Sequence, residues 1–270
     1  MKNKFAMIIL TGILSLTTCT SAYAASITQG EAVDALVKTS TSFRRSGSSV
    51  EVYVSEASYD NVWNIMQNGI NNVFRSCSHH TLGRYTWYSN GISRYYELDA
   101  KKLKELSEHQ AAVDEWSRSI ATQLFPDGTD RESVIYTSYL HITRNFSYDK
   151  KCFDDVEKRQ EAQDAYYLIT NGSGICSSFA KTFRSLVEIV PFNPSTWTVD
   201  WQCSSPINIK VAIVENLHIH EWAAIQENDS SWRYYDCTFK KDELSGYALS
   251  SDTLDFLGGY GDASERIWYY

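Results

Sequence analysis

The stretch from Asn171 to Val190 restricts the fold of this chain more than any other part of the sequence. It opens with a turn rich in glycine and serine, and apolar residues then recur at the i, i+3, i+4, i+7 spacing of one helical face. Those apolar residues are Phe179, Ala180, Phe183, Leu186, Val187 and Val190. Because Pro191 cannot continue a helix, the pattern predicts a helix that begins near Cys176, buries one face and ends before the proline.

Cys176 falls in or just before the first turn of this predicted helix. The free N–H groups and the dipole at a helix N-terminus favour a negative charge, and the thiolate is the form of cysteine that attacks. Small residues ahead of the cysteine allow a close approach of substrate, so we expect Gly174 to contact it. The alternative is a small buried residue at a helix start, because unpaired cysteine is commonly buried. This stretch alone does not decide between the two.

The hydrophobic pattern has a helical period before this stretch and alternates after it. Before it, we expect helices over Lys101 to Phe125, from Asp130 onward, and over Asp154 to Ile169. After it, the segments that alternate like strands are Thr196 to Trp201, Lys210 to Val214, His220 to Gln226 and Trp232 to Phe239. Helices followed by antiparallel strands predict an α+β domain.

Residues 26–128 predict a separate, small α+β domain of unknown role. Valines alternate over 50–54 as in a strand, and Asn90-Gly91 between two aromatic-rich runs is a strong hairpin signal. Pro126-Asp127-Gly128 ends the long helix and marks the domain boundary. We therefore expect the second domain over 129–270.

Residues 1–24 have the features of a secretory signal peptide. Two lysines precede an apolar run from Phe5 to Leu16, and Ala22-Tyr23-Ala24 offers a cleavage site between small residues. The run is too short for a membrane span, and we expect no span later in the chain. The sequence thus predicts cleavage after Ala24 and a secreted or cell-surface protein, with lipoprotein anchoring at Cys19 as the second interpretation.

The net charge argues against nucleic-acid binding, and the spacing of histidines and cysteines argues against a metal site. The net charge of −8 argues against a nucleic-acid partner, because phosphate binding needs clustered Lys and Arg. The adjacent histidines His79-His80 cannot share one face of a helix or strand, and the chain has no Cys-x-x-Cys pair. We therefore expect neither a metal site nor another cofactor.

Removal of residues 1–24 would leave five cysteines, which is an odd number. In a secreted protein an odd count leaves one thiol free. A reactive Cys176 and two disulfides fit this count, and so do five reduced thiols. The cysteines available for such disulfides are Cys77, Cys152, Cys203 and Cys237.

Two residues on the last pair of predicted strands complement Cys176. A five-residue turn over 227–231 would put Trp222 roughly opposite Asp236, with His220 diagonally across from that carboxylate. A histidine held by a carboxylate keeps one tautomer and remains basic enough to take a proton from a thiol. His218 lies on the same strand face and is a second candidate, but it has no tryptophan two residues later. Cysteine, histidine and aspartate together would form a complete nucleophilic triad.

Three motifs in this order resemble those of the bacterial transglutaminase-like superfamily, whose fold is related to papain. Gly174 to Ala180 resembles the nucleophile motif, and His220-Glu221-Trp222 resembles the His-x-Trp strand. Trp232 to Thr238 is similar to the Trp-x-x-x-Asp-x-Thr strand of the family. The segment from Tyr139 to Asp149 also resembles the helix and exit that open these domains, so the resemblance covers about 130–270.

This resemblance implies a nucleophile helix packed on an antiparallel sheet. It implies Cys176 as the nucleophile, His220 as general base and acid, and Asp236 as the group that orients the histidine. The family performs acyl transfer on amides through a thioester, which water or an amine resolves. We therefore expect a peptide or protein substrate, with cell-wall peptide as one candidate, and Trp222 beside it.

The same resemblance leaves three functions open. A protease and a transglutaminase would share the triad, and a binding or scaffold protein could carry the domain in an idle form. The oxyanion of an acyl transfer would be held by the backbone N–H of Cys176 and one more donor, which the sequence does not identify.

Overall fold

The fold is mixed helix and strand (α+β) in the computed structural model. The structure describes residues 34, 37–38, 43–46, 49–55, 73–77, 86–89, 93–98, 100–216, 220–227, 230–239, 244–257, 260 and 266–269. The predicted signal peptide, His79-His80, Asn90-Gly91 and His218 lie outside these residues.

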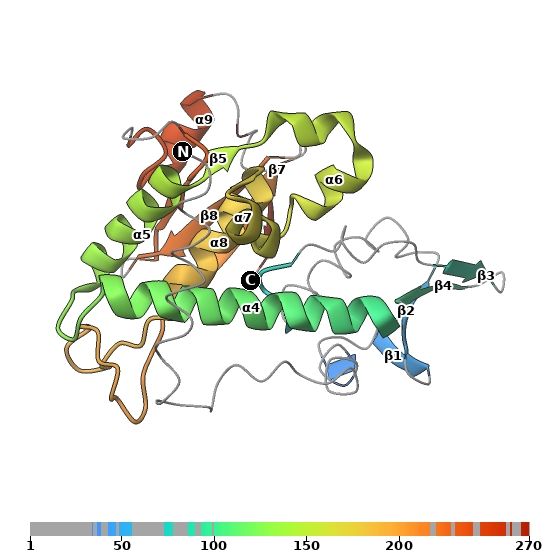
Figure 1. The fold of residues 1–270 in the computed structure, drawn as a ribbon, viewed down its shortest axis with the longest axis horizontal. Coiled ribbons are helices and arrows are strands. Elements are labelled where there is room, and N and C mark those ends of the chain that lie inside the picture. Colours follow the sequence, from blue (N-terminus) through green and yellow to red (C-terminus); the bar gives the residue numbers. More distant parts are fainter. Residues whose placement is uncertain are drawn as a thin grey trace.

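A four-stranded antiparallel sheet lies in the N-terminal part of the chain, with strand order β1-β2-β4-β3. Its strands are β1 (Phe43–Ser46), β2 (Ser49–Ser55), β3 (Thr86–Ser89) and β4 (Ser93–Leu98). The predicted strand over 50–54 is confirmed in β2. The two aromatic-rich runs pair antiparallel, with Ser89 opposite Arg94, as the predicted hairpin requires. Figure 1 shows this sheet well away from α5 and α8.

The long helices have the predicted extents. They are α4 (Ala100–Leu124), α5 (Arg131–Asn145) and α8 (Cys176–Glu188). Asp130 is the N-cap of α5, and its carboxylate accepts a hydrogen bond from the Ser133 backbone N–H at 2.9 Å.

The single helix predicted over 154–169 is wrong, because the chain there forms three short elements. They are the 3-10 helix η3 (Lys150–Asp154), α6 (Val156–Glu161) and α7 (Ala165–Asn171). The Asp155 carboxylate accepts the backbone N–H groups of Glu157 and Lys158, which starts a new helix at α6. The N–H of Ala165 donates to the carbonyl of Ser76 at 2.9 Å, so a tertiary contact interrupts the helical hydrogen bonds.

The second sheet is antiparallel and has the strand order β10-β7-β8-β9. Its strands are β7 (Val211–Asn216), β8 (Glu221–Gln226), β9 (Trp232–Tyr235) and β10 (Arg266–Tyr269). A short helix, α9 (Ser251–Leu257), lies between β9 and β10 in the chain. Two further strands, β5 (Ser147–Tyr148) and β6 (Ser173–Gly174), pair in parallel.

Two strand predictions need correction. The segment 196–201 forms only isolated bridges at Thr198 and Val199, because it turns at Trp197, whose φ of 55° is left-handed. The strand predicted over 232–239 ends at Tyr235. There the Asp236 carboxylate accepts the backbone N–H and the hydroxyl of Thr238, which folds the chain into a turn.

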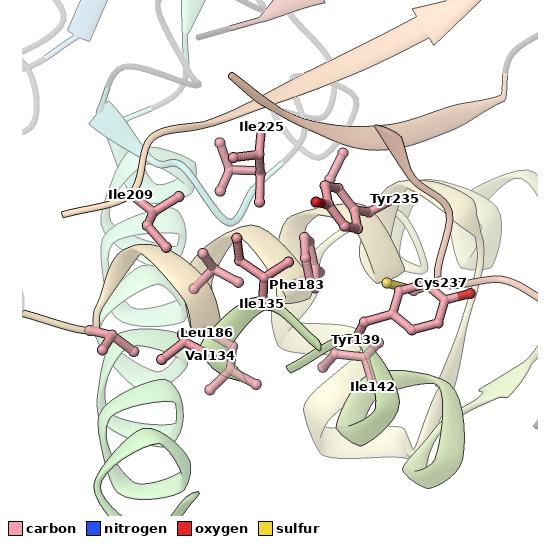
Figure 2. Close-up of a cluster of buried hydrophobic side chains, with 14 of the residues drawn as sticks. Val134, Ile135, Tyr139, Ile142, Phe183, Leu186, Ile209, Ile225, Tyr235 and Cys237 are labelled. Atoms are coloured by element: carbon pink, nitrogen blue, oxygen red, sulfur yellow. The ribbon is translucent and has the colours of Figure 1, made fainter. Parts of the chain in front are cut away.

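Helix α8 lies at the centre of the molecule and is buried over nearly its whole length. It packs against α4, α5 and α7 and against strands β7 and β8. Figure 2 shows Phe183 and Leu186 of this helix between side chains of α5 and Ile225 and Tyr235 of the sheet.

The same core includes Ala121 and Phe125, so residues ahead of 128 share it with residues that follow. The predicted boundary at 128 stays a prediction.

Candidate functional site

Cys176 is the first residue of α8, and 5 % of it is exposed. Ser178 fixes the start of the helix, because its hydroxyl accepts the Ile175 backbone N–H at 3.0 Å and donates to the Ile175 carbonyl at 2.8 Å. The same hydroxyl lies where a side chain at residue 174 would begin, so the close approach requires Gly174. The predicted contact of Gly174 with substrate stays a prediction.

His220 lies directly before β8, and its Nε2 is 2.7 Å from Oδ2 of Asp236. The β8–β9 register pairs Ala223 with Tyr235, so the next position brings Trp222 beside Asp236, as the turn length predicted. Asn216 holds the histidine backbone from both sides. Its side-chain oxygen accepts the His220 N–H at 3.0 Å, and its own N–H donates to the His220 carbonyl at 3.1 Å.

Asp236 is 2 % exposed, and its carboxylate accepts hydrogen bonds from three of the described residues. Besides His220, Tyr260 donates its hydroxyl to Oδ2 at 2.9 Å, and Thr238 donates its N–H and hydroxyl to Oδ1 at 3.0 and 2.6 Å. The Asp236 N–H donates to the Gly246 carbonyl at 2.9 Å. This carboxylate therefore has one fixed orientation, with one oxygen directed at the imidazole.

The side chain of Cys176 also lies close to the His220 imidazole, because its hydrogen bonding and its charge both raise the pKa of the histidine. Since Nε2 faces Asp236, Nδ1 is the nitrogen left for the sulfur. Burial alone would lower the pKa of His220, but the hydrogen bonds and charges of Asp236 and Cys176 outweigh it and raise that pKa to about 10. Burial would likewise raise the pKa of Asp236, yet its bonds to His220 and Thr238 lower it. The charged histidine is thus stabilised between a carboxylate and a sulfur.

Two aromatic rings, those of Trp222 and Tyr260, lie close to the imidazole of His220. The Trp222 ring centroid lies 5.6 Å from that of His220, and the Tyr260 centroid lies 5.6 Å from it as well. Trp222 is 1 % exposed, and its indole N–H has no hydrogen-bond acceptor among the described residues. A role of Trp222 in binding substrate stays a prediction. Tyr260 could not be identified from the sequence, because this residue belongs to no motif and to no periodic run of apolar residues.

A buried ion pair joins the cysteine helix to the histidine strand. Nζ of Lys181 is 2.7 Å from Oε2 of Glu221, with 0 % and 6 % of the two side chains exposed. The Ser177 hydroxyl donates to the other oxygen, Oε1, at 2.7 Å. Ser177 and Glu221 each follow a predicted triad member directly in the sequence. This network fixes the separation of Cys176 and His220, and the sequence patterns did not reveal it.

Tyr148, in β5, also lies beside Cys176. Its hydroxyl lies within hydrogen-bonding reach of both the side chain and the backbone N–H of Cys176. Burial first, and then the neighbouring Cys176, raise the pKa of this phenol well above its ordinary value.

No disulfide joins any two of the described cysteines, which are Cys77, Cys152, Cys176, Cys203 and Cys237. Within the described ranges, no cluster of three His, Cys, Asp or Glu residues converges as a metal site would require. Of the helices in the described part of the chain, none combines the length and apolar character needed to cross a membrane.

Comparison with known proteins gives this chain no family. No protein-family model matches its sequence, and no curated protein is significantly similar to it.

Proposed function

We propose that this protein is a cysteine-dependent enzyme that transfers acyl groups from peptide or protein amides, with Cys176 as nucleophile, His220 as general acid and base, and Asp236 as the orienting carboxylate. The observation that carries this proposal is the position of the His220 imidazole. It lies 2.7 Å from Asp236 and beside Cys176, whose side chain helps to raise the pKa of the histidine. This is the arrangement of a nucleophile, a base and its orienter.

The reaction would follow from these contacts. Cys176 first transfers its thiol proton to His220. The sulfur then forms a bond to the amide carbon, and the π electron pair of the carbonyl moves to oxygen. Collapse reforms the carbonyl and expels the amine, which takes the proton from His220. Water or a second amine then gives a proton to His220 and attacks the thioester, which releases the thiol of Cys176.

A transglutaminase-like core is part of the proposal. In favour of it, α8 carries Cys176 at its first residue and packs on β7 and β8, while His220 and Asp236 follow in order at the adjoining strands. The predicted signal peptide over 1–24 supports a secreted or cell-surface enzyme. A cell-wall peptide is one substrate of that compartment.

A second candidate function is an idle binding or scaffold domain. The observation that favours it is the burial of Cys176, of which 5 % is exposed. The environment of His220 favours an enzyme instead, because a histidine whose pKa is raised to about 10 beside a thiol and a carboxylate is typical of catalytic sites.

Alkylation with iodoacetamide distinguishes the two candidates. Mass spectrometry would follow the label at Cys176, separately from the more exposed Cys203, near neutral pH. An enzyme should label quickly at Cys176 and lose that rate in His220→Ala, while the control His141→Ala keeps it. Slow labelling in every variant would support the idle domain.

The reaction type needs a substrate assay. A glutamine-containing peptide with a labelled primary amine would report transamidation by incorporation, deamidation by a mass gain, and proteolysis by chain cleavage. If Cys176→Ser leaves all observed products unchanged, the enzyme proposal is wrong.

A further inference from the structure

Acyl transfer at Cys176 needs two donors for the oxygen that becomes negative. The backbone N–H of Cys176, at the N-terminal end of α8, provides one of them. The second donor must lie about 3 Å from the same oxygen, on an element that the fold holds rigidly. Tyr148 meets the requirement for a rigid element.

The backbone of Tyr148 is tied directly to the segment that leads into Cys176. In the parallel β5–β6 pair, Tyr148 lies opposite Gly174, and the next residue, Asp149, donates its N–H to the Gly174 carbonyl at 2.8 Å. On the other side, the Ser147 N–H donates to the Gly172 carbonyl at 3.1 Å. These bonds hold Tyr148 in register with a residue that lies two positions before the nucleophile.

The ring of Tyr148 is fixed by stacking. Its centroid is 6.3 Å from that of Phe179, which lies one helical turn after Cys176, and 6.5 Å from that of Phe153. The ring also packs against the buried cluster of Cys152, Ala162 and Ile175. Because the ring stacks on two other rings, its hydroxyl has little freedom to leave the start of α8.

The hydroxyl occupies a place suited to an oxyanion donor. It lies within hydrogen-bonding reach of the Cys176 side chain and of the Cys176 backbone N–H. The acyl oxygen of a tetrahedral intermediate is bonded to the carbon that the sulfur attacks, so it must lie near the sulfur and that N–H at once. A phenol is protonated at neutral pH, and burial and the neighbouring cysteine raise its pKa further, so it can donate.

We propose that the Tyr148 hydroxyl is the second oxyanion donor of this site. The inference rests on the proposed function and identifies a catalytic residue for it. As the Cys176 sulfur bonds to the acyl carbon and the π electron pair moves to oxygen, the Tyr148 hydroxyl and the Cys176 N–H both donate to that oxygen. When the carbonyl reforms and the leaving group departs, both donors return to their resting contacts, and Tyr148 keeps its proton throughout.

The test uses two probes that differ in one respect. p-Nitrophenyl acetate acylates a thiol through a tetrahedral oxyanion and releases p-nitrophenolate, whereas iodoacetamide alkylates by displacement of iodide and forms no oxyanion. Each rate is measured at Cys176 in the full chain across pH, and the plateau rates are compared. Tyr148→Phe removes one oxygen atom and leaves the stacked ring. Tyr167→Phe is the matched control, because Tyr167 packs on the same buried cluster.

We expect Tyr148→Phe to lower the plateau acylation rate about 100-fold, the loss typical of one oxyanion donor. Its plateau alkylation rate should stay close to that of the wild type and should still depend on His220, which also reports that the site has folded. Tyr167→Phe should change neither rate.

Two results would overturn the assignment of Tyr148 as an oxyanion donor and leave the proposed function standing. One is a Tyr148→Phe variant that acylates as fast as the wild type. The other is an equal loss of acylation and alkylation, which would make Tyr148 a residue that only positions the cysteine. If wild-type Cys176 reacts slowly with both probes and His220→Ala changes nothing, the proposed function itself fails.

Discussion

The ion pair between Lys181 and Glu221 gives the sharpest prediction about the stability of this fold. The two side chains are 2.7 Å apart, with 0 % and 6 % exposed, and Ser177 is the other described residue that bonds the glutamate. In Lys181→Met, the carboxylate would stay buried beside a thioether and keep, among the described residues, the Ser177 hydroxyl. The perturbation therefore leaves an uncompensated charge inside the protein.

The expected cost follows from that burial. Removing one partner of a buried ion pair typically costs about 3–5 kcal/mol, out of a total unfolding free energy of about 5–15 kcal/mol. With a urea m value of about 2 kcal/mol per M, the unfolding midpoint should fall by roughly 1.5–2.5 M. The double variant Lys181→Met/Glu221→Met should recover most of this loss, because a buried pair can be replaced by apolar side chains at little cost.

Urea unfolding followed by tryptophan fluorescence measures these midpoints. The matched control is Lys104→Met, which breaks the exposed pair of Lys104 with Glu108 at 3.3 Å and should cost less than about 1 kcal/mol. If Lys181→Met also costs less than about 1 kcal/mol, the charge is solvated or neutral in the folded protein and the reasoning about this network is wrong.

Three further predictions concern the histidine and its carboxylate. Because folding raises the pKa of His220 from 6.5 to about 10, its stabilising effect is complete below pH 6.5 and is lost as pH rises to 10. The thermal midpoint of the wild type should therefore fall over this window more than that of His220→Gln, and parallel curves would contradict it. Tyr260→Phe should lower the unfolding free energy by about 1.5–3 kcal/mol, since Asp236 loses a charge-assisted hydrogen bond, and a urea midpoint equal to that of the wild type would count against that bond. Gly246→Ala should cost about 1–3 kcal/mol and remove the His220 dependence of Cys176 alkylation, because the added carbon would collide with the Asp236 carbonyl oxygen. An unchanged alkylation rate in this variant would mean that Asp236 tolerates displacement.

Local sequence patterns were sufficient for the elements that carry the candidate triad. The apolar period from Phe179 to Val190 predicted α8, and the length of the turn over 227–231 predicted the register that brings His220 to Asp236. Both signals are local: a helical face has its own period, and a short turn fixes which residues of two strands meet.

The errors and omissions have a different physical origin. Asp155 starts a helix of its own and Ala165 donates to the distant Ser76, so the continuous helix expected over 154–169 does not form. Tyr260 and Glu221 meet the site only through tertiary contacts, at 2.9 Å from Asp236 and 2.7 Å from Lys181. Neither contact leaves a period or a motif in the sequence.

The two ends of α8 are anchored to different parts of the chain. Near its start, Ser177 donates its hydroxyl to Glu221 of the histidine strand. At its end, Glu188 accepts hydrogen bonds from the Arg75 guanidinium and, at 2.9 Å, from the Val211 backbone N–H. A displacement of Arg75 would therefore be passed to the end of the helix whose first residue is Cys176.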